Sequence, residues 1–182
     1  MSVFTVKSKV ISNRDAVPPL LSNPEVAQGL IKGVIGVENT GNFGADIGAA
    51  GTAIKLITIP SNARIQNLEY GVGDLGTSSL DIAVFYPTSF LQGGQNTPAQ
   101  SLAGTPVSSS TFATAIAGVD TSIAWTDAMG VAANPTLQNR IKPLWSLVGL
   151  SSDPGFDFDL GFTVRTAVVQ NGYVGLRATY ID

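Results

Sequence analysis

The sequence predicts an all-β fold: an antiparallel β-sandwich, jelly-roll-like with about eight strands, an extended N-terminal arm and at most one or two short helices. Three observations predict it. The 182-residue chain has 20 glycines and is rich in threonine, valine and isoleucine, with turn-forming clusters at short intervals. Strand-like segments follow one another with few helical stretches, so no βαβ unit can be placed. Residues 156–165 alternate between apolar and polar side chains, as in a strand with one buried face.

The first residues are predicted to form an arm outside the sandwich. Residues 1–12 are extended in character, and three prolines between residues 18 and 24 then prevent regular structure. We therefore expect an arm over residues 1–25 and a single β-sandwich domain over residues 26–182. A chain of this length can build one domain with a substantial core, whereas two domains would be cramped.

The remaining elements are predicted from apolar runs and the turn residues between them. Core strands are expected over residues 29–37, 53–59, 63–70 and 80–86, with two more within 156–180. The polar residues 87–106 predict a long surface loop. Residues 111–125 fit either a short helix or a strand, and their β-branched side chains favour a strand. Asn134 before Pro135 is typical of a helix start, and Pro143 would interrupt that helix.

The last two strands are predicted to form a hairpin. The even-numbered residues of 156–164 and of 174–180 are apolar, so both strands would bury their even positions. A two-residue turn at Asn171-Gly172 would pair odd with even positions. A three-residue loop over residues 170–172 pairs even with even, for example Phe162 with Tyr180. We therefore expect a type I turn with Gly172 in the left-handed G1-bulge position.

The composition excludes most enzyme chemistries. The chain has no histidine and no cysteine, which leaves no Ser-His-Asp triad, no cysteine nucleophile and no imidazole or thiolate zinc site. The sequence also lacks S-x-x-K and G-x-S-x-G motifs. We therefore expect a protein that is not an enzyme and needs no cofactor.

The sparse charge favours contact with other protein subunits. Charged residues make up 13% of the chain, compared with about 25% in ordinary domains. A net charge of −3 argues against a nucleic-acid partner, which would need clustered basic residues. The sequence shows no targeting segment and no run of 18 apolar residues, so we expect no membrane partner.

One motif matches the dinucleotide-binding fingerprint as a string. Gly71, Gly73 and Gly76 spell G-x-G-x-x-G directly after a predicted strand. A nucleotide site needs a helix after the third glycine and an acidic residue about 20 positions later. The segment after Gly76 has strand composition, and residues 90–97 contain no acid. The glycines are therefore predicted to form a loop between two antiparallel strands.

The acidic residues Asp153, Asp157 and Asp159 resemble part of a calcium loop. A calcium loop wraps its backbone around the ion, whereas the Phe/Asp alternation here requires an extended strand. Asp157 and Asp159 are therefore expected to point outward on one face, solvated or paired with Arg165 or Arg177. No metal site is predicted.

Two groups of residues remain as candidates for binding. Lys7, Lys9 and Arg14 make the arm basic, and such an arm could lie across an acidic neighbour and add a strand to its sheet, or could simply fray. Trp125 with Asp127 is the nearest approach to an aromatic and acidic patch for carbohydrate. The tryptophans are otherwise expected in the core or at a subunit interface.

Three stretches resemble a family of small virion proteins of tailed bacteriophages. The first is KSKVISNRDAVPPLLSNPEVAQGLIKGVIG, with an Asn-x-Asp-Ala-x-Pro turn before the first strand. The second is IKLITIPSNARIQNLEYGVGDLGTSSLDIAVFYP, and the third is KPLWSLVGLSSDPGFDFDLGFTVRTAVVQNGYVGLRATY. The resemblance covers most of the chain and is poorest over residues 88–130.

The resemblance implies a structural virion protein of the capsid decoration, or cement, type, located on the capsid surface and assembled in the host cytoplasm. Its partners would be the major capsid protein and further copies of itself, with a trimer as the first expectation. Lys7, Lys9 and Arg14 would contact capsid or subunit. Another virion component (neck, tail or fibre base) and a carbohydrate- or receptor-binding β-sandwich module are the alternatives.

Overall fold

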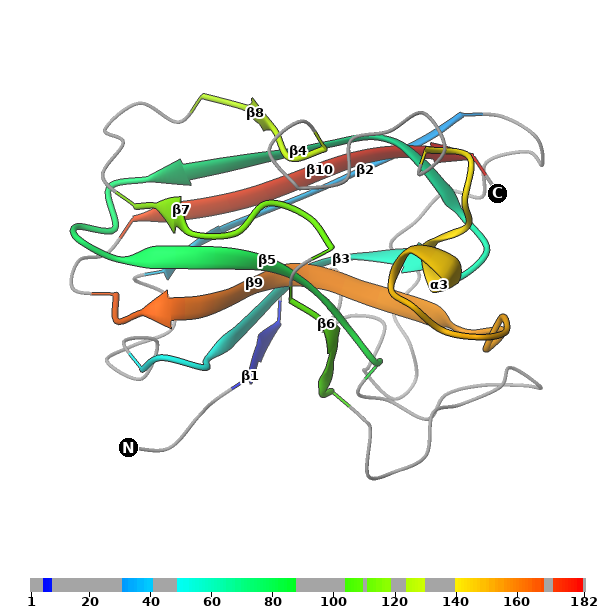
Figure 1. Cartoon of the computed structure of the whole chain (residues 1–182). Helices are drawn as coiled ribbons and strands as arrows, with labels where there is room; N and C mark the ends of the chain where they lie inside the picture. Colours follow the sequence, from blue (N-terminus) through cyan, green and yellow to red (C-terminus); the bar gives the residue numbers. More distant parts are fainter. Residues whose placement is uncertain are drawn as a thin grey trace, which may run out of the picture.

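Two β-sheets stacked face to face form the body of the protein (Figure 1). The computed structural model describes residues 5–7, 31–40, 49–87, 104–109, 111–118, 124–129, 140–168 and 172–181. All strand pairs within these residues are antiparallel except one. The predicted all-β sandwich is confirmed.

The strands divide unequally between the two sheets. The six-stranded sheet has the order β1 (Thr5–Lys7), β3 (Ala53–Pro60), β9 (Asp157–Thr166), β5 (Ser79–Phe85) and β6 (Pro106–Ser108), with β7 (Ile116–Ala117) also paired to β5. The four-stranded sheet has the order β2 (Lys32–Asn39), β10 (Tyr173–Ile181), β4 (Arg64–Gly73) and β8 (Thr126–Asp127).

The connectivity is that of a jelly roll. Successive strands from β2 to β5 alternate between the two sheets, as do β8, β9 and β10. The four-stranded sheet is therefore β2-β10-β4-β8, and it faces β3-β9-β5 followed by the short strands β6 and β7. Two sheets connected in this way form two Greek keys, an arrangement by which antiparallel proteins limit the exposure of unpaired edge strands. The jelly-roll expectation from strand number is thus confirmed at the level of strand order.

Alternation along the strands produces the core. On β9, Phe158, Leu160 and Phe162 are buried between the sheets. On β10, Val174 and Leu176 face them from the opposite sheet. Each fully buried side chain of this size contributes about 1.5–3 kcal/mol of transfer free energy. The predicted burial of even-numbered residues is confirmed for 156–164 and for 174–178, whereas Tyr180 is only partly buried.

The predicted hairpin between these two strands is wrong. β9 pairs with β3 and β5, whereas β10 pairs with β2 and β4. Phe162 lies opposite Ile54 and Ile82 rather than opposite Tyr180. A strand with one apolar face buries the same residues whether its neighbour in sequence lies beside it or across the core. The alternation of even and odd positions therefore identified the buried residues, but it did not identify which strand pairs with which.

Gly172 also differs from its predicted conformation. The described glycines with positive φ are Gly51, Gly76, Gly104, Gly149 and Gly155, and Gly172 is not among them. A Cβ added to Gly172 would lie 2.0 Å from the carbonyl oxygen of Gly73. Close approach of two backbones, not a left-handed turn, explains the glycine at this position.

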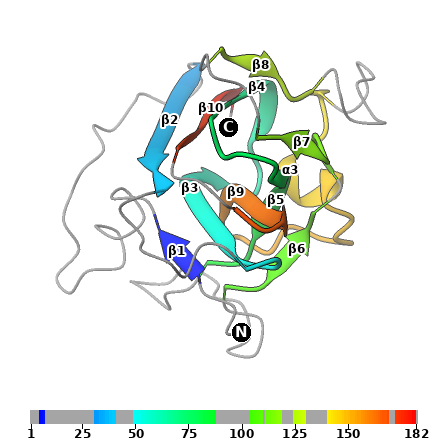
Figure 2. The ribbon, with the colours of Figure 1, turned by 90° about the vertical axis from the view of Figure 1, so that its left-hand side faces the viewer.

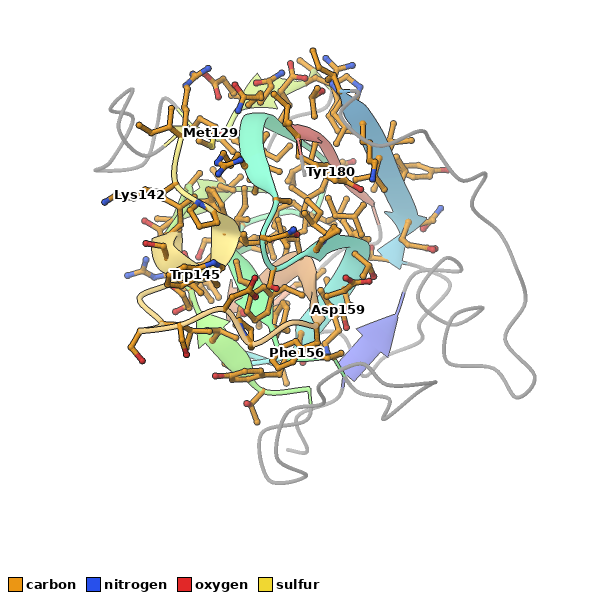
Figure 3. The ribbon with its side chains drawn as sticks, turned by 90° about the vertical axis from the view of Figure 1, so that its right-hand side faces the viewer. Met129, Lys142, Trp145, Phe156, Asp159 and Tyr180 are labelled. Atoms are coloured by element: carbon orange, nitrogen blue, oxygen red, sulfur yellow. The ribbon has the colours of Figure 1, made fainter. Side chains whose placement is uncertain are left out.

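A short helix lies at one end of the sandwich. The helix α3 (Leu144–Leu147) begins directly after Pro143. Its first two amides donate to the carbonyl oxygens of Ala63 and Ser61 in the turn between β3 and β4, at 2.8 and 3.0 Å. Figure 3 shows Trp145 of α3 beside this end of the core. The predicted helix start at Asn134 lies outside the described residues.

One short strand lies within the predicted arm. Within the predicted arm, Thr5–Lys7 forms β1 and pairs in parallel with β3 of its own chain (Figure 2). The boundary predicted between residues 25 and 26 lies outside the described residues. None of the described helices is long and apolar enough to cross a membrane.

Candidate interaction surface

One row of residues crosses the outer face of the four-stranded sheet from edge to edge. Strand register places Arg177 of β10 between Ile35 of β2 and Glu69 of β4. Glu69 in turn lies opposite Asp127 of β8. Residues paired in this way point to the same face of a sheet. The outer face therefore carries an apolar side chain at the β2 edge and charged side chains toward β8.

The centre of this row is a bidentate ion pair between Arg177 and Glu69. Nη2 of Arg177 donates to Oε1 of Glu69 at 2.9 Å, and Nε donates to Oε2. The hydrogen bonds from Arg177 lower the pKa of Glu69 below its ordinary value, with a further contribution from the positive charge. The hydrogen bonds to Glu69 raise the pKa of Arg177. Both shifts favour the charged form of the group concerned, so the pair is ionised at neutral pH.

Trp125 lies over this ion pair. The guanidinium carbon of Arg177 is 4.7 Å from the ring centroid of Trp125, which is cation–π geometry. A Cβ on Gly175 would lie 3.0 Å from Cη2 of Trp125, so the glycine lets the indole approach the sheet. Gly175 pairs with Gly71 on the next strand. The tryptophan is thus part of the surface of the sheet, and one of its ring faces is taken by Arg177.

An apolar strip follows the outer side of β2. Ile31, Ile35 and Val37 are 66%, 56% and 49% exposed, and alternation along the chain places them on one face. We call these three residues the β2 strip. β2 is the outermost strand in its sheet order, with its one described strand partner β10 on the other side. Exposed side chains of this size grouped along β2 and the residue before it, Ile31, are typical of a contact surface.

A shallow groove adjoins the strip. It has a volume of about 330 Å³ and is lined by Gly33, Val34 and Ile35 of β2, by Arg177, Ala178 and Thr179 of β10, and by Glu69 of β4. Gly33 leaves room there, because a Cβ at this position would meet no atom within 4 Å. The strip and the groove together form a continuous surface that is apolar at β2 and bordered by one ion pair.

The outer face of the six-stranded sheet carries a different feature, a buried ion pair. Nζ of Lys55 lies 3.4 Å from Oδ2 of Asp159, and both side chains have 0% exposure. Nζ also donates to the carbonyl oxygen of Tyr86 at 3.2 Å. Thr58 donates from its hydroxyl to the other carboxylate oxygen of Asp159 at 3.1 Å. Figure 3 labels Asp159 just below the middle of the side-chain layer.

This pair corrects the prediction for the acidic residues. Asp159 is predicted to point outward, either solvated or paired with Arg165 or Arg177. It does lie on the outer face of its sheet, but it is buried there and its partner is Lys55. Nη1 of Arg165 lies 3.5 Å from Oδ1 of Asp81, so Arg165 pairs with a different carboxylate. Asp153 accepts hydrogen bonds from Ser61 and from the amide of Gly155, which fixes a turn. In the described part of the chain no group of three acidic side chains is placed to hold a metal ion.

The glycine motif is partly strand and partly turn. Gly71 and Gly73 lie within β4, whereas the prediction had ended that strand at Tyr70. Gly76 has φ of 68° in the turn, and Ser79–Phe85 follows as β5. A strand after the third glycine was predicted correctly. The assignment of all three glycines to a loop was wrong, because two of them lie inside β4, where Gly71 pairs with Gly175 and Gly73 with Tyr173.

The structure places only one of the basic arm residues. Lys7 is the last residue of β1 and pairs with Lys55 in register. Lys9 and Arg14 lie outside the described residues, so their predicted contacts remain predictions. Sequence analysis missed the row formed by Ile35, Arg177 and Glu69. The odd-numbered, outward position of Arg177 was the one available signal, since register between distant strands has no local signature.

Comparison with known proteins gives a fold likeness. No family model matches the sequence, and no curated protein sequence matches it either. Among solved structures, the capsid of Ralstonia phage GP4 is similar, with a TM-score of 0.58 and 16% sequence identity. The match covers 98% of this chain and 97% of that chain. At this identity the likeness shows a shared fold over essentially the whole chain.

Proposed function

We propose that this chain is a structural protein of a tailed-phage virion, and that it binds and stabilises the assembled capsid shell as a decoration protein. The observation that carries the proposal is the end-to-end fold likeness to a chain of a phage capsid. The match covers 98% of this chain and 97% of that chain, so it depends on both sheets and not on one local motif. The family resemblance of the sequence supports the same conclusion independently.

The β2 strip is the surface proposed to contact the shell. It combines exposed isoleucine and valine side chains with a shallow groove, in a chain whose charged residues are only 13% of the total. Burying apolar surface contributes about 25 cal/mol per Å², and a low charge density reduces the cost of removing water. A protein that binds only the assembled lattice stabilises that lattice by mass action.

The carbohydrate-binding alternative is less well supported by the geometry. It needs an aromatic ring face open to a sugar beside polar side chains. Trp125 presents one ring face to Arg177 at 4.7 Å. The side chain of Asp127 accepts a hydrogen bond from the amide of Met129 at 2.7 Å, so it stabilises its own turn. Both candidate residues thus have structural roles in the sheet.

The decisive experiment is reconstitution. Purified protein is added to capsids prepared without it, and the capsids are sedimented and analysed for bound protein. A decoration protein gives saturable binding with a fixed copy ratio, and it raises the temperature at which the capsids release their DNA. Binding to isolated tails or necks but not to capsids would move the protein to another virion location. Retention on a glycan array without capsid binding would instead support the carbohydrate-binding alternative.

A further inference from the structure

The strand β1 pairs differently from every other described strand. Thr5, Val6 and Lys7 lie beside Ala53, Ile54 and Lys55 in a parallel register, while all other described pairs are antiparallel. β1 is also at the edge of its sheet and only three residues long. β1 is therefore held to β3 by backbone pairing over only three residues. The same edge of β3 can pair with an equivalent strand from another molecule.

The connection between β1 and β2 is much longer than the structure requires. Lys7 pairs with Lys55, the neighbour of Leu56, and the Leu56 carbonyl oxygen would lie 2.4 Å from a Cβ on Gly36 of β2. A path through these contacts and back along β2 to Lys32 is under about 30 Å long. Residues 8–31, which join the two strands, number 24. An extended chain of that length spans up to about 80 Å.

This excess length is sufficient to span the distance to a neighbouring copy. A domain of this size is about 40 Å across, so a connection that can span twice that distance can place β1 on an adjacent copy. Figure 2 shows β1 at the outer edge of β3, below β2 and away from the interior of the sandwich.

We propose that β1 is exchanged between copies of this chain: residues 5–7 of one copy pair with residues 53–55 of its neighbour in the register seen here. In the exchanged form, the edge of β3 is occupied by β1 of a second copy, because the strand that fits this edge is part of the same sequence. The exchanged and unexchanged forms have identical strand contacts, so the balance between them depends on local concentration. The proposal needs only the chain itself and does not depend on its binding to a capsid.

The exchange explains how copies would be linked at high density. The β1 strand of the same chain competes with the β1 strand of a neighbour for the edge of β3. The effective concentration of a chain's own β1 at this edge is on the order of millimolar. Neighbours held side by side on a surface reach similar concentrations, and each would then donate one strand and receive another. A head-to-tail exchange of this kind closes into a ring when the rotation between copies permits. A trimer, the first expectation from the sequence, is one such ring.

The absence of cysteine from the chain makes a direct test possible. The variants Thr5→Cys and Ala53→Cys are prepared separately, mixed, unfolded, refolded together at high protein concentration and oxidised. Paired residues on adjacent strands have Cα separations within the range a disulfide accepts. Exchange predicts covalent dimers in the mixture, made of one chain of each variant. Val6→Cys with Ala53→Cys is the matched control, since one residue of offset turns the side chain to the other face.

The doubly substituted chain, Thr5→Cys with Ala53→Cys, completes the design. With exchange it gives covalent oligomers at high concentration and intramolecular links at low concentration. An intramolecular link at every concentration, with no dimer in the mixture of single variants, would overturn the proposal. Equal cross-linking in the Val6→Cys control, or no link in the doubly substituted chain, would also overturn it. Deleting residues 1–7 should remove the oligomer while leaving the far-ultraviolet circular dichroism of the sandwich unchanged.

Discussion

Lys55 and Asp159 form an ion pair with no exposed surface on the outer side of the six-stranded sheet. The ammonium group also lies 5.3 Å from the ring centroid of Phe85 and donates to the carbonyl oxygen of Tyr86. Two charges taken out of water lose several kcal/mol of hydration each. Their mutual contact and their additional hydrogen bonds offset that loss, so neither residue can be replaced alone without consequence.

Replacing Lys55 by methionine is expected to destabilise the protein by about 3 kcal/mol, because the Asp159 carboxylate loses its cationic partner while it remains buried. The double variant Lys55→Met with Asp159→Leu should recover most of that loss. Urea denaturation of the four proteins in the cycle measures the coupling. Strictly additive effects of the two substitutions would show that the pair is not coupled.

Gly36 should be far less tolerant of a side chain than Gly33 on the same strand. A Cβ at Gly36 would lie 2.4 Å from the carbonyl oxygen of Leu56 and 3.0 Å from Ile57, whereas a Cβ at Gly33 meets nothing within 4 Å. Gly36→Ala should therefore cost about 1–3 kcal/mol through forced separation of β2 and β3. Gly33→Ala should change stability by less than about 1 kcal/mol. Thermal unfolding of the two variants, compared side by side, provides the test.

The contact between Thr40 and Gly172 should depend on one hydroxyl group. The buried Thr40 Oγ1 accepts from the Gly172 amide at 2.8 Å, and the Thr40 amide donates to the Gly172 carbonyl oxygen at 2.7 Å. Thr40→Val keeps the shape but leaves the Gly172 amide without this acceptor, at a cost of about 1–3 kcal/mol. Thr40→Ser retains the hydroxyl and should lose less. If the valine variant is as stable as the serine variant, the hydrogen bond contributes nothing.

The β2 strip should determine shell binding without affecting folding. Ile35→Lys places an ammonium group in the proposed contact and should weaken binding to capsids by about tenfold or more. Ile141→Lys makes the same change at an isoleucine that is 63% exposed. Figure 3 shows the adjacent Lys142 on the opposite side of the molecule from β2. Both variants should keep the wild-type melting temperature, and equal capsid binding by the two would exclude the strip as the contact.

Acidification should act partly through Glu69. Because its pKa in the folded protein lies below the ordinary value of 4.5, its ionised form is favoured by folding. The resulting stability is fully present above pH 4.5 and is lost as the pH falls through the lowered pKa. Glu69→Gln should therefore show a shallower decline of melting temperature below pH 4.5 than the wild type.

The contribution of the Glu69 charge to stability should be small, because the ion pair is partly exposed to water. The Arg177 side chain is 43% exposed, and water and salt screen its attraction to Glu69. Raising the salt concentration should bring the two pH profiles together. Profiles that differ equally at low and high salt would mean that Glu69 acts through something other than its charge.

Local patterns were sufficient to predict the six long strands, but not the short strands β6 and β8. Within the described part of the segment 111–125, only Ile116–Ala117 forms a strand. Residues 53–59 and 80–86 were expected as strands and are found as β3 and β5 with shifts of one residue at their ends. Alternation also identified Phe158 and Leu176 as core residues. These are properties of a few consecutive residues, since side chains alternate along any extended strand.

Pairing between distant strands could not be predicted in the same way. The segments 156–165 and 173–180 are neighbours in sequence with matching parity, yet they lie in different sheets. Likewise, Arg177 meets Glu69 across a separation of 108 residues. The burial of Asp159 depends on what covers the outer face of its sheet, which no alternation pattern records.

The order of the strands also determines when the protein can fold. β9 lies between β3 and β5, and β10 lies between β2 and β4, so each of these central strands follows both of its neighbours in the sequence. A ribosome-bound chain that has not yet been extended through β9 and β10 has unjoined sheet halves with open edges. The two sheets are therefore expected to form only after β10 has been synthesised, at the slow rate of a topology dominated by distant contacts. A truncation that removes β9 and β10 would take out the middle of both sheets, not a dispensable tail.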